Sequence, residues 1–348
     1  MKTSLNRREF LKTTLGGAAA LGSTSLLRSP SLFARELYNV GDITITWAGV
    51  NQFYLPCAVA KEKGFFEEEG VKVGKFFTSK GGSETVRNII DGGLPFGECS
   101  ADSAAMAIVK RKEPFKLVSG GCKSLGSMMW LVRPDSNIKK VQDLKGKTLC
   151  FSSPGSVSEA AIALALKSAP GIEPEDVKKI ACGGIGAGLT LLEKGEVDAA
   201  LSSEPTTSTK GGKFRILFYA RDFVPDYFMS FWMARESFLK EHPDTMRGFL
   251  RARARGVKFT VENPEETAKI LMKTNEGATS MELAMKTLKS EGILDGQFFS
   301  DNRFIKEGLE TVVRGMRVVG LIPPDGTIPW DKIIDQSYID PDKRIKLQ

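Results

Sequence analysis

Residues 177–204 read VKKIACGGIGAGLTLLEKGEVDAALSSE. The apolar run from Val177 to Ala181 is typical of a strand, and a Gly-rich loop, a helical pattern and a Gly turn follow it. A second strand pattern runs from Asp198 to Ser202 and ends in a Ser-x-acid motif. Because a helix separates the two strands, we expect them to lie parallel in one sheet, which predicts an α/β fold.

The same order of elements occurs 102 residues earlier, in residues 75–102, KFFTSKGGSETVRNIIDGGLPFGECSAD. Two copies are too few for a solenoid, and chance similarity between two ordinary βα units is the alternative explanation. We predict two lobes built on one plan, with equivalent loops at the carboxyl ends of their strands. The matching positions are Gly81-Gly82 and Gly183-Gly184, Gly93 and Gly195, Ser100 and Ser202, and Asp102 and Glu204.

Strand and helix patterns alternate from residue 42 to 119 and again from 128 to 219, which is typical of βαβ units. After Arg235 the strand patterns stop, and three or four amphipathic helices are expected. In the helix that begins near Pro243, Arg253 lies at the centre of the apolar face. We expect Arg253 to snorkel or to pair with a buried carboxylate.

The amino-acid composition excludes several classes of function. The 348 residues include 49 Lys and Arg against 42 Asp and Glu, a net charge of +7, with 41% apolar residues, five Cys and one His. This is enough apolar sequence for about two domains. The single His242 and the lack of any C-x-x-C spacing exclude most zinc and His-dependent catalytic sites, so no metal and no cofactor are expected. The five cysteines are expected to be small buried side chains.

The first 34 residues resemble an export signal. The motif Arg7-Arg8-Glu9-Phe10-Leu11-Lys12 resembles the core of twin-arginine signals. The apolar stretch after it is about half of the roughly 20 residues that a membrane span needs. Cleavage after Ala34 would remove a net charge of +4 from the total of +7. The remaining charge gives no reason to expect a nucleic-acid partner, and the signal predicts a periplasmic protein.

Several segments of the mature chain resemble hallmark segments of periplasmic solute-binding proteins of ABC importers. The resemblance is closest to the NMT1/THI5-like group, which feeds importers of the sulfonate, taurine, nitrate and thiamine-pyrimidine type. The segments are residues 60–71 (AKEKGFFEEEGV), 143–147 (DLKGK), 195–200 (GEVDAA) and 238–243 (FLKEHP).

This resemblance implies a type II periplasmic-binding-protein fold. Each lobe would contain a mostly parallel sheet flanked by helices, and two hinge crossovers near residues 119–123 and 219–225 would join the lobes. Lobe one would comprise residues 40–121 and 220–348, and lobe two residues 122–219. A ligand would be trapped between the lobes when the hinge closes.

In open α/β sheets, ligands bind at loops that follow the carboxyl ends of strands. Here those loops are rich in Ser and Gly, which suits a carboxylate, a sulfonate or a polar heterocycle, and they lack the spacing of nucleotide-phosphate motifs. The candidate ligand-binding residues are Trp47, Asn51, Gln52, Tyr54, Lys80, Gly81, Gly82, Ser83, Ser100, Asp102, Ser153, Ser156, Gly186, Glu204 and Tyr227.

Structural roles are alternatives for these candidates. The aromatic residues are also typical of a core or a rim, and Ser83 and Ser156 are also typical helix N-caps. Asp102 and Glu204 fall in the first turns of their predicted helices, where an acid complements the helix dipole. Alternatively, the two carboxylates face a ligand N–H group across the cleft, one from each lobe. That arrangement would favour a nitrogen-bearing ligand over nitrate or sulfate.

The sequence therefore predicts a monomeric binding protein that delivers a small polar organic ligand to the transmembrane subunits of an ABC permease. It would meet the membrane only through that permease. An enzyme like the THI5-type pyrimidine synthase is an alternative, but that pattern is a Cys cluster plus histidines, and this chain has no adjacent cysteines and one His. A ligand-sensing partner of a membrane receptor is a third possibility that the sequence does not separate from the first.

Overall fold

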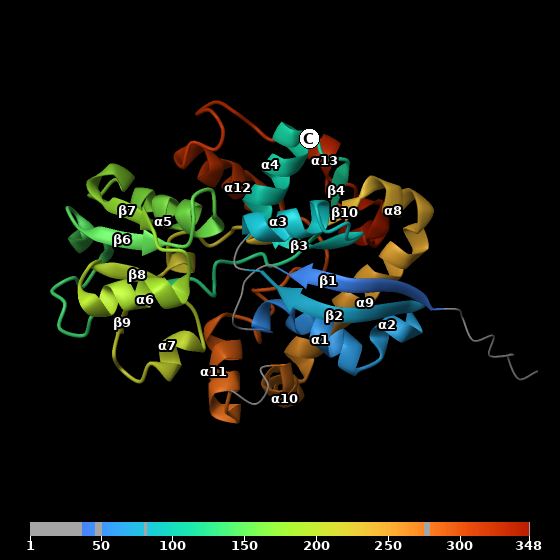
Figure 1. Cartoon of the computed structure of the whole chain (residues 1–348), viewed down its shortest axis with the longest axis horizontal. Coiled ribbons are helices and arrows are strands. Elements are labelled where there is room, and N and C mark those ends of the chain that lie inside the picture. The colour runs from blue at the N-terminus through green and yellow to red at the C-terminus, as the bar shows by residue number, and fades with distance from the viewer. Residues whose placement is uncertain (1–36, 46–50, 80–81, 275–278, 348) are drawn as a thin grey trace, which may run out of the picture. The chain divides into compact units, whose positions relative to one another are not determined.

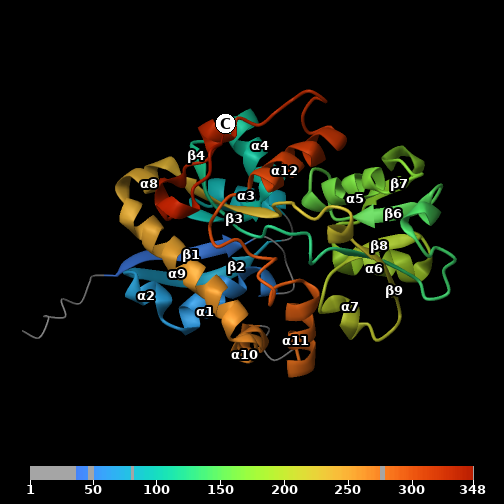
Figure 2. The same cartoon turned by 180° about the vertical axis from the view of Figure 1, so that it is seen from behind.

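The computed structural model describes residues 37–45, 51–79, 82–274 and 279–347. These residues form two five-stranded sheets flanked by helices (Figures 1 and 2). Within these ranges no helix is both long and apolar enough to cross a bilayer. The predicted export signal in residues 1–34 lies outside the described residues, as do Trp47, Lys80 and Gly81.

The first sheet has the strand order β2-β1-β3-β10-β4. Strand β1 lies parallel to β2 and β3, whereas β10 lies antiparallel to β3 and β4. The strands are β1 (Tyr38–Ile45), β2 (Val71–Thr78), β3 (Phe96–Ser100), β4 (Phe115–Gly120) and β10 (Ser230–Arg235). The helices between them are α1 (Leu55–Glu62), α2 (Phe65–Glu68), α3 (Gly82–Ile90) and α4 (Ala101–Arg111), preceded by the 3-10 helix η1 (Asn51–Tyr54).

The second sheet has the strand order β7-β6-β8-β5-β9. Strand β6 lies parallel to β7 and β8, whereas β5 lies antiparallel to β8 and β9. The strands are β5 (Met129–Val132), β6 (Thr148–Phe151), β7 (Lys178–Ala181), β8 (Ala199–Ser202) and β9 (Arg215–Tyr219). The helices are α5 (Val157–Ser168), α6 (Ile185–Lys194) and α7 (Thr206–Thr209).

The two sheets repeat one plan, as the 102-residue offset predicts. Strands β1, β2, β3, β10 and β4 of the first sheet correspond to β6, β7, β8, β5 and β9 of the second. Both sheets are mixed, and four of the five strands in each run in the same direction, which confirms the expectation of mostly parallel sheets; the exceptions are β10 and β5. The chain leaves the first sheet at the carboxyl end of β4 and enters the second at the carboxyl edge of its parallel strands. Strand β5 must therefore run antiparallel to β8. Strand β10 must likewise run antiparallel to β3, because the second crossover brings the chain back to the carboxyl edge of the first sheet.

Helices make up most of the chain after β10. They are α8 (Glu236–Glu241), α9 (Pro243–Glu262), α10 (Pro264–Thr274), α11 (Met281–Ser290), α12 (Lys306–Val318) and α13 (Trp330–Ile333). Short 3-10 helices also occur in the described chain, namely η2 (Val141–Leu144), η3 (Pro174–Asp176), η4 (Ala220–Asp222), η5 (Gln336–Tyr338) and η6 (Pro341–Lys343).

Helix α9 packs on the first sheet through an aromatic cluster. The ring of Phe249 lies 5.1 Å from that of Phe66, 4.7 Å from that of Phe96 and 4.9 Å from that of Trp232. All four side chains are fully buried. The apolar face expected for this helix is therefore the face that meets the sheet.

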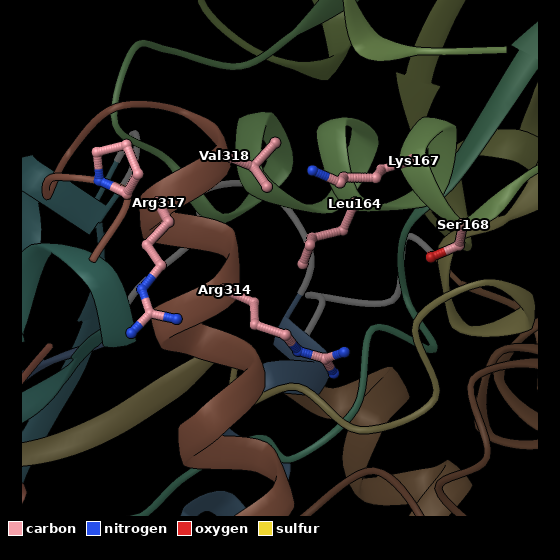
Figure 3. A pocket seen from close by; sticks show the side chains of 7 residues that line it. Leu164, Lys167, Ser168, Arg314, Arg317 and Val318 are labelled. Atoms are coloured by element: carbon pink, nitrogen blue, oxygen red, sulfur yellow. The ribbon is translucent and has the colours of Figure 1, made fainter. Parts of the chain in front are cut away.

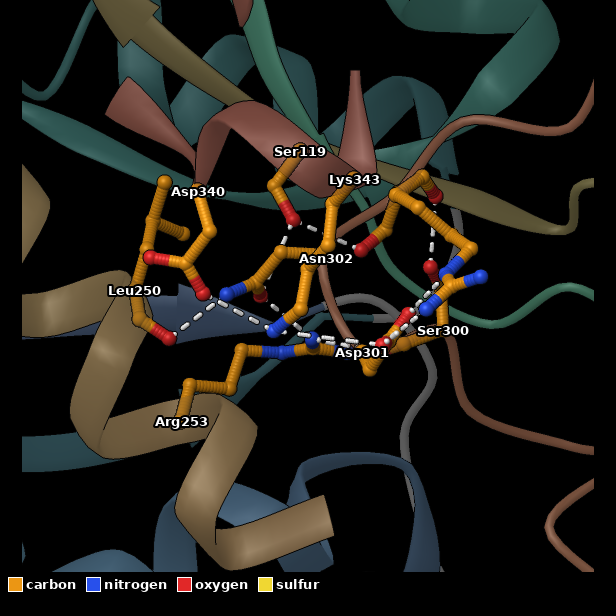
Figure 4. A network of polar contacts seen from close by, with 10 residues as sticks. Ser119, Leu250, Arg253, Ser300, Asp301, Asn302, Asp340 and Lys343 are labelled. Atoms are coloured by element: carbon orange, nitrogen blue, oxygen red, sulfur yellow. Dashed lines mark hydrogen bonds and ion pairs between the residues drawn. The ribbon is translucent and has the colours of Figure 1, made fainter. Parts of the chain in front are cut away.

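Arg253 of α9 is 1% exposed and does not snorkel. Figure 4 shows its guanidinium beside Ser300 and Asn302, where Nη1 donates to the Ser300 carbonyl (2.8 Å) and to Asn302 Oδ1 (3.0 Å). Nη2 donates to the Gly121 carbonyl at 3.3 Å. No ion pair forms with a described carboxylate. Arg253 still acts on the buried Glu98, because burial raises the pKa of Glu98 and the Arg253 charge opposes that rise.

Candidate ligand-binding site between the two sheets

Two crossover segments join the sheets, residues 121–128 and 220–229. The two segments are joined by hydrogen bonds next to the first sheet. The Met229 N–H donates to the Cys122 carbonyl (2.9 Å), the Gly121 N–H to the Ser230 carbonyl (3.0 Å), and the Cys122 N–H to Ser230 Oγ (2.8 Å). Because β4 and β9 both end at these crossovers, the carboxyl edges of the two sheets lie on the crossover side. The ligand-binding loops predicted for both sheets follow those edges.

Asp102 is the second residue of α4 and is fully buried. Tyr227 Oη, from the second crossover, lies 2.9 Å and 3.0 Å from its two carboxylate oxygens and donates to them. Burial raises the pKa of Asp102 to about 7, the Tyr227 hydrogen bond opposes this rise, and the charge of Glu159 on α5 adds to it. Two predicted ligand residues, Asp102 and Tyr227, therefore contact each other, and the charge of Glu159 on a helix beside the second sheet acts on Asp102.

A cavity of about 290 Å³ adjoins Asp102 and has walls from both halves of the fold. Helices α3 and α4 form one wall, Pro154 and Gly155 of the loop after β6 form another, and Leu321 closes a third side. The volume is near the lower end of small-molecule sites, which span roughly 300–1,000 Å³. The start of α4, which directly follows β3, and the loop after β6 thus border one cavity. The lining residues are Val86, Asp102, Ser103, Met106, Ala107, Lys110, Arg111, Pro154, Gly155 and Leu321.

Three hydroxyl groups meet at the start of α5. Ser152 Oγ lies 2.7 Å from Ser158 Oγ and 3.1 Å from Ser156 Oγ, and the last two lie 2.9 Å apart. Ser156 also accepts the Glu159 N–H at 3.4 Å. The N-cap role expected as an alternative for Ser156 is therefore confirmed, and its hydroxyl already has neighbours that can donate or accept.

A second group of polar side chains spans the interface. Gln52 is fully buried, and its Nε2 donates to the Glu204 carbonyl (3.1 Å) and to Glu291 Oε1 (3.2 Å). Gln52 Oε1 and Glu291 Oε2 are buried acceptors with no hydrogen-bond partner in the described chain. Burial raises the pKa of Glu291 well above its usual range, and the charge of Glu204 raises it further, against the Gln52 hydrogen bond. Buried orphan acceptors are rare in native proteins and point to a missing donor.

Glu291 follows the last residue of α11, and no sequence motif marks it. Gly126 in the first crossover faces the Glu291 carbonyl so closely that a Cβ there would collide with it. The Arg221 guanidinium, from the second crossover, donates to the Ser290 carbonyl at 2.5 Å. Both crossovers therefore hold the end of α11 at the interface, and only this packing brings Glu291 beside Gln52.

A family model described as NMT1/THI5-like matches residues 51–267, more than half of the 348 residues. The chain belongs to the NMT1/THI5-like family. No curated protein matches the sequence significantly.

This NMT1/THI5-like chain has the periplasmic-binding-protein fold. The alkanesulfonate-binding protein SsuA from Xanthomonas axonopodis pv. citri, bound to MOPS, matches with a TM-score of 0.67 at 14% identity, over 87% of this chain and 99% of that one. The periplasmic aliphatic sulphonate binding protein SsuA from Escherichia coli matches with a TM-score of 0.64 at 19% identity, over 85% of this chain and 92% of that one. The desulfurization enzyme DSZB matches with a TM-score of 0.59 at 16% identity, over 85% of this chain and 97% of that one. Binding proteins and an enzyme thus share this fold.

The other predicted site residues of the NMT1/THI5-like chain have mixed positions. Tyr54 is half-buried and stacks on Phe76 of β2 at 5.5 Å, as expected of a rim aromatic. Ser100 Oγ is buried and has no hydrogen-bond partner among the residues described. Ser153 is half-buried, and its carbonyl accepts the Ser156 N–H at 3.2 Å.

Glu204 is not in the first turn of its helix, so that expectation is wrong. It lies two residues before α7, and its carboxylate accepts the Ser208 N–H (3.1 Å) and hydroxyl (3.0 Å). The shortness of α7 explains the difference, because the helix begins only after Pro205. Gly186 lies on α6 with open space where a side chain would project. Asn51 begins η1 and Gly82 begins α3, followed by Ser83; the side chains of Asn51 and Ser83 lie outside the described part of the structure.

No cluster of three His, Cys, Asp or Glu side chains in the described ranges could hold a metal ion. His242 accepts from or donates to Tyr38 Oη through Nε2 at 2.9 Å. Tyr38 begins β1, so His242 lies at the amino edge of the first sheet, opposite the edge where the predicted loops meet. The single histidine is therefore not part of the interface described above.

Proposed function

We propose that this protein is the solute-binding component of an ABC importer and that it captures a small polar organic ligand between its two sheets. Family membership and the fold shared with SsuA proteins support this role. The observation that carries the proposal is the 290 Å³ cavity bordered by α3 and α4, which flank the first sheet, and by the loop after β6 of the second sheet. Closure of two lobes over such a cavity is the usual way in which this architecture traps a ligand.

The ligand proposed here bears N–H groups. Asp102, Gln52 and Glu291 present oxygen acceptors at the interface, and two of those oxygens have no donor within the described chain. A ligand with only negative charge would meet repulsion from Glu204 and, as the pH rises above 7, from Asp102. A ligand that combines an N–H group with an anionic or aromatic part fits both these acceptors and the Ser-rich loop before α5.

Capture without covalent chemistry is favoured over catalysis. A THI5-type synthase pattern would need clustered cysteines and histidines, and the only histidine is bonded to Tyr38 at the far edge of β1. We further propose export to the periplasm through the twin-arginine signal predicted in residues 1–34, and delivery of the ligand to the transmembrane subunits of a permease. A sensing role with a membrane receptor would use the same site.

The test begins with native mass spectrometry of the folded protein and identification of copurified compounds. Thermal-shift and calorimetric titrations with amines, pyrimidines, aromatic carboxylates and sulfonates follow, in a buffer free of sulfonates. We expect Asp102→Ala, which changes a residue lining the cavity, and Gln52→Ala, which removes an unpartnered buried acceptor at the interface, each to weaken binding about tenfold, as the loss of a hydrogen bond to a charged or buried group does. Thr190→Ala, on the exposed face of α6, is the control and leaves the affinity unchanged. Turnover of the bound compound, or affinity unchanged by both site variants, would contradict the proposal.

A further inference from the structure

A second cavity, of about 480 Å³, lies between α5 of the second sheet and α12 near the C-terminus. It shares no lining residue with the cavity at Asp102. Figure 3 shows Arg314 extending from α12 beneath Leu164 of α5, and the Lys167 side chain pointing back toward Val318 of α12. The lining residues are Leu164, Lys167, Ser168, Arg314, Arg317, Val318 and Pro324. Three of these carry a positive charge and none carries a negative one.

The three cations have no carboxylate partner among the residues that the structure describes. Arg314 Nη2 donates to Thr311 Oγ1 (2.7 Å), and Arg317 Nε donates to the Gly326 carbonyl (2.8 Å). Their remaining N–H groups, and the ammonium of Lys167, have no acceptor within the described ranges.

The arginines exposed on α9 differ from those of α12. Arg247 pairs with Asp244 at 2.8 Å, Arg251 with Glu69 at 2.6 Å, and Arg255 with Glu68 at 2.6 Å. Glu307 and Glu310, with Asp226, line an adjoining cavity that shares Arg314 and Arg317 with this one, but none of the three acids forms an ion pair with either arginine in the described residues. The three cations of this cavity are therefore in no ion pair within the described residues, in contrast to the exposed arginines of α9.

Close packing of the two helices fixes the backbone positions from which the cations project. A Cβ built on Gly315 would lie 3.1 Å from Ala160 Cβ and 3.1 Å from Tyr227 Oη, so α12 meets α5 at a point where only a glycine fits easily. Arg314 is adjacent to Gly315, and Lys167 lies in the last turn of α5. Both cations are thus carried by rigid helices whose contact positions them on either side of one cavity.

We propose that this cavity binds a small organic dianion at a site separate from the ligand cleft. A guanidinium offers two parallel N–H donors to a carboxylate or phosphate, and an ammonium across the cavity can hold a second charge. Leu164, Val318 and Pro324 provide an apolar wall for a short carbon skeleton. The volume lies within the roughly 300–1,000 Å³ typical of small-molecule sites. Dicarboxylates and phosphate monoesters share this chemistry.

The probes are succinate and phenyl phosphate, with butyrate as the monoanionic comparison. Calorimetric titrations of the full mature protein in dilute Tris chloride are expected to show one saturable site for at least one dianion. That dianion should bind about tenfold more tightly than butyrate, which is the effect of one additional charged hydrogen bond. The tighter of the two dianions identifies the acid group that the site prefers.

The decisive variant is Lys167→Gln combined with Arg314→Gln, which should weaken dianion binding at least about tenfold. Arg87→Gln combined with Lys194→Gln removes two exposed cations on α3 and α6 and is the matched control, because it changes the net charge equally. Circular dichroism and thermal unfolding verify that both double variants fold. Equal weakening in both variants, no weakening in the first, or no saturable binding of either dianion would overturn the proposal. So would loss of dianion binding in Gln52→Ala, since that result places the anion in the cleft.

Discussion

Asp102 is a buried carboxyl group that titrates near neutral pH. Burial raises its pKa to about 7 in the folded protein, from 3.8 in a solvated aspartate. Between these two pH values the folded state binds more protons than the unfolded state, so the stabilising contribution is complete at low pH and is lost as the pH rises through 7. We expect Asp102→Asn to remove this part of the pH dependence while its amide oxygen still accepts the Tyr227 hydroxyl.

The measurement is urea unfolding of both proteins at pH 5, 6, 7 and 8. The wild-type free energy of unfolding should fall relative to that of the variant by up to about 1.4 kcal/mol per pH unit over this interval. Asp143→Asn is the control. The pKa of Asp143 is lowered because its exposed carboxylate accepts backbone N–H groups of Lys139 and Lys140, so it titrates below this interval. Parallel pH profiles for wild type and Asp102→Asn would show that Asp102 is not the titrating group.

Arg253 is a second residue whose environment makes a sharp prediction. Its guanidinium holds the Ser300 carbonyl, Asn302 and the Gly121 carbonyl together, and its charge opposes the burial of Glu98. We expect Arg253→Met to lower the free energy of unfolding by about 3–5 kcal/mol, because it leaves the buried Ser300 carbonyl, the Gly121 carbonyl and Asn302 Oδ1 without this donor. Arg247→Met, on the same helix but in an exposed ion pair, should cost about 0–1 kcal/mol. Equal costs in urea unfolding would contradict this assignment.

The sequence predicts where the candidate site residues lie along the chain, but not which side chains they bind. The loops around Gln52, Asp102 and Ser156 could be identified because strand ends and helix starts have local patterns. The partners could not, since Tyr227 lies 125 residues from Asp102 and Glu291 lies 239 residues from Gln52. Spacing along the chain carries no information about such contacts, which depend on how the crossovers pack against α11. For the same reason Arg253 could be placed on the apolar face of its helix, but the backbone carbonyls that it binds could not be predicted.

At the scale of elements, the alternation of strands and helices and the mostly parallel sheets were predictable, but the reversed direction of β5 and β10 was not. The internal repeat at an offset of 102 correctly predicts two sheets with corresponding strands. Strands β5 and β10 have ordinary apolar sequences, MWLV and SFWMAR, which resemble those of parallel strands. Their direction follows from the route of the crossovers between two carboxyl edges, which is a property of the whole chain.

The contact between α1 and α9 depends on one glycine. A Cβ on Gly256 would collide with the backbone carbonyl of Pro56, which cannot move aside as a flexible side chain can. We expect Gly256→Ala to lower the free energy of unfolding by about 1–3 kcal/mol through overpacking. Gly186→Ala on α6 is the matched control, because its added methyl meets open space and should raise stability by about 0.5–1 kcal/mol through helix propensity. Urea unfolding checks both, and two shifts of the same sign would contradict the packing argument.

At the scale of the molecule, one hydrophobic cluster links the two sheets. It contains Trp232 of the first sheet and Trp130 of the second, together with buried residues of α5, α9 and α12. Trp232 packs 4.9 Å from Phe249, and Trp130 stacks on Phe218 at 5.3 Å. Because the cluster is continuous through the crossovers, neither sheet can lose its packing without exposing the core of the other. Residues 37–348 are therefore expected to unfold as one cooperative unit.

Single-tryptophan proteins test this expectation. The chain has four tryptophans, and replacing three by Phe leaves either Trp130 or Trp232 as the only fluorophore for its sheet. In each variant the urea midpoint from fluorescence is compared with the midpoint from circular dichroism of that same variant, so differences in stability between variants cancel. Both sheets should give coincident midpoints, because two-state unfolding looks the same to every probe. If the Trp130 fluorescence changed at lower urea than the circular dichroism, the second sheet would unfold on its own and the shared core would not couple it to the first.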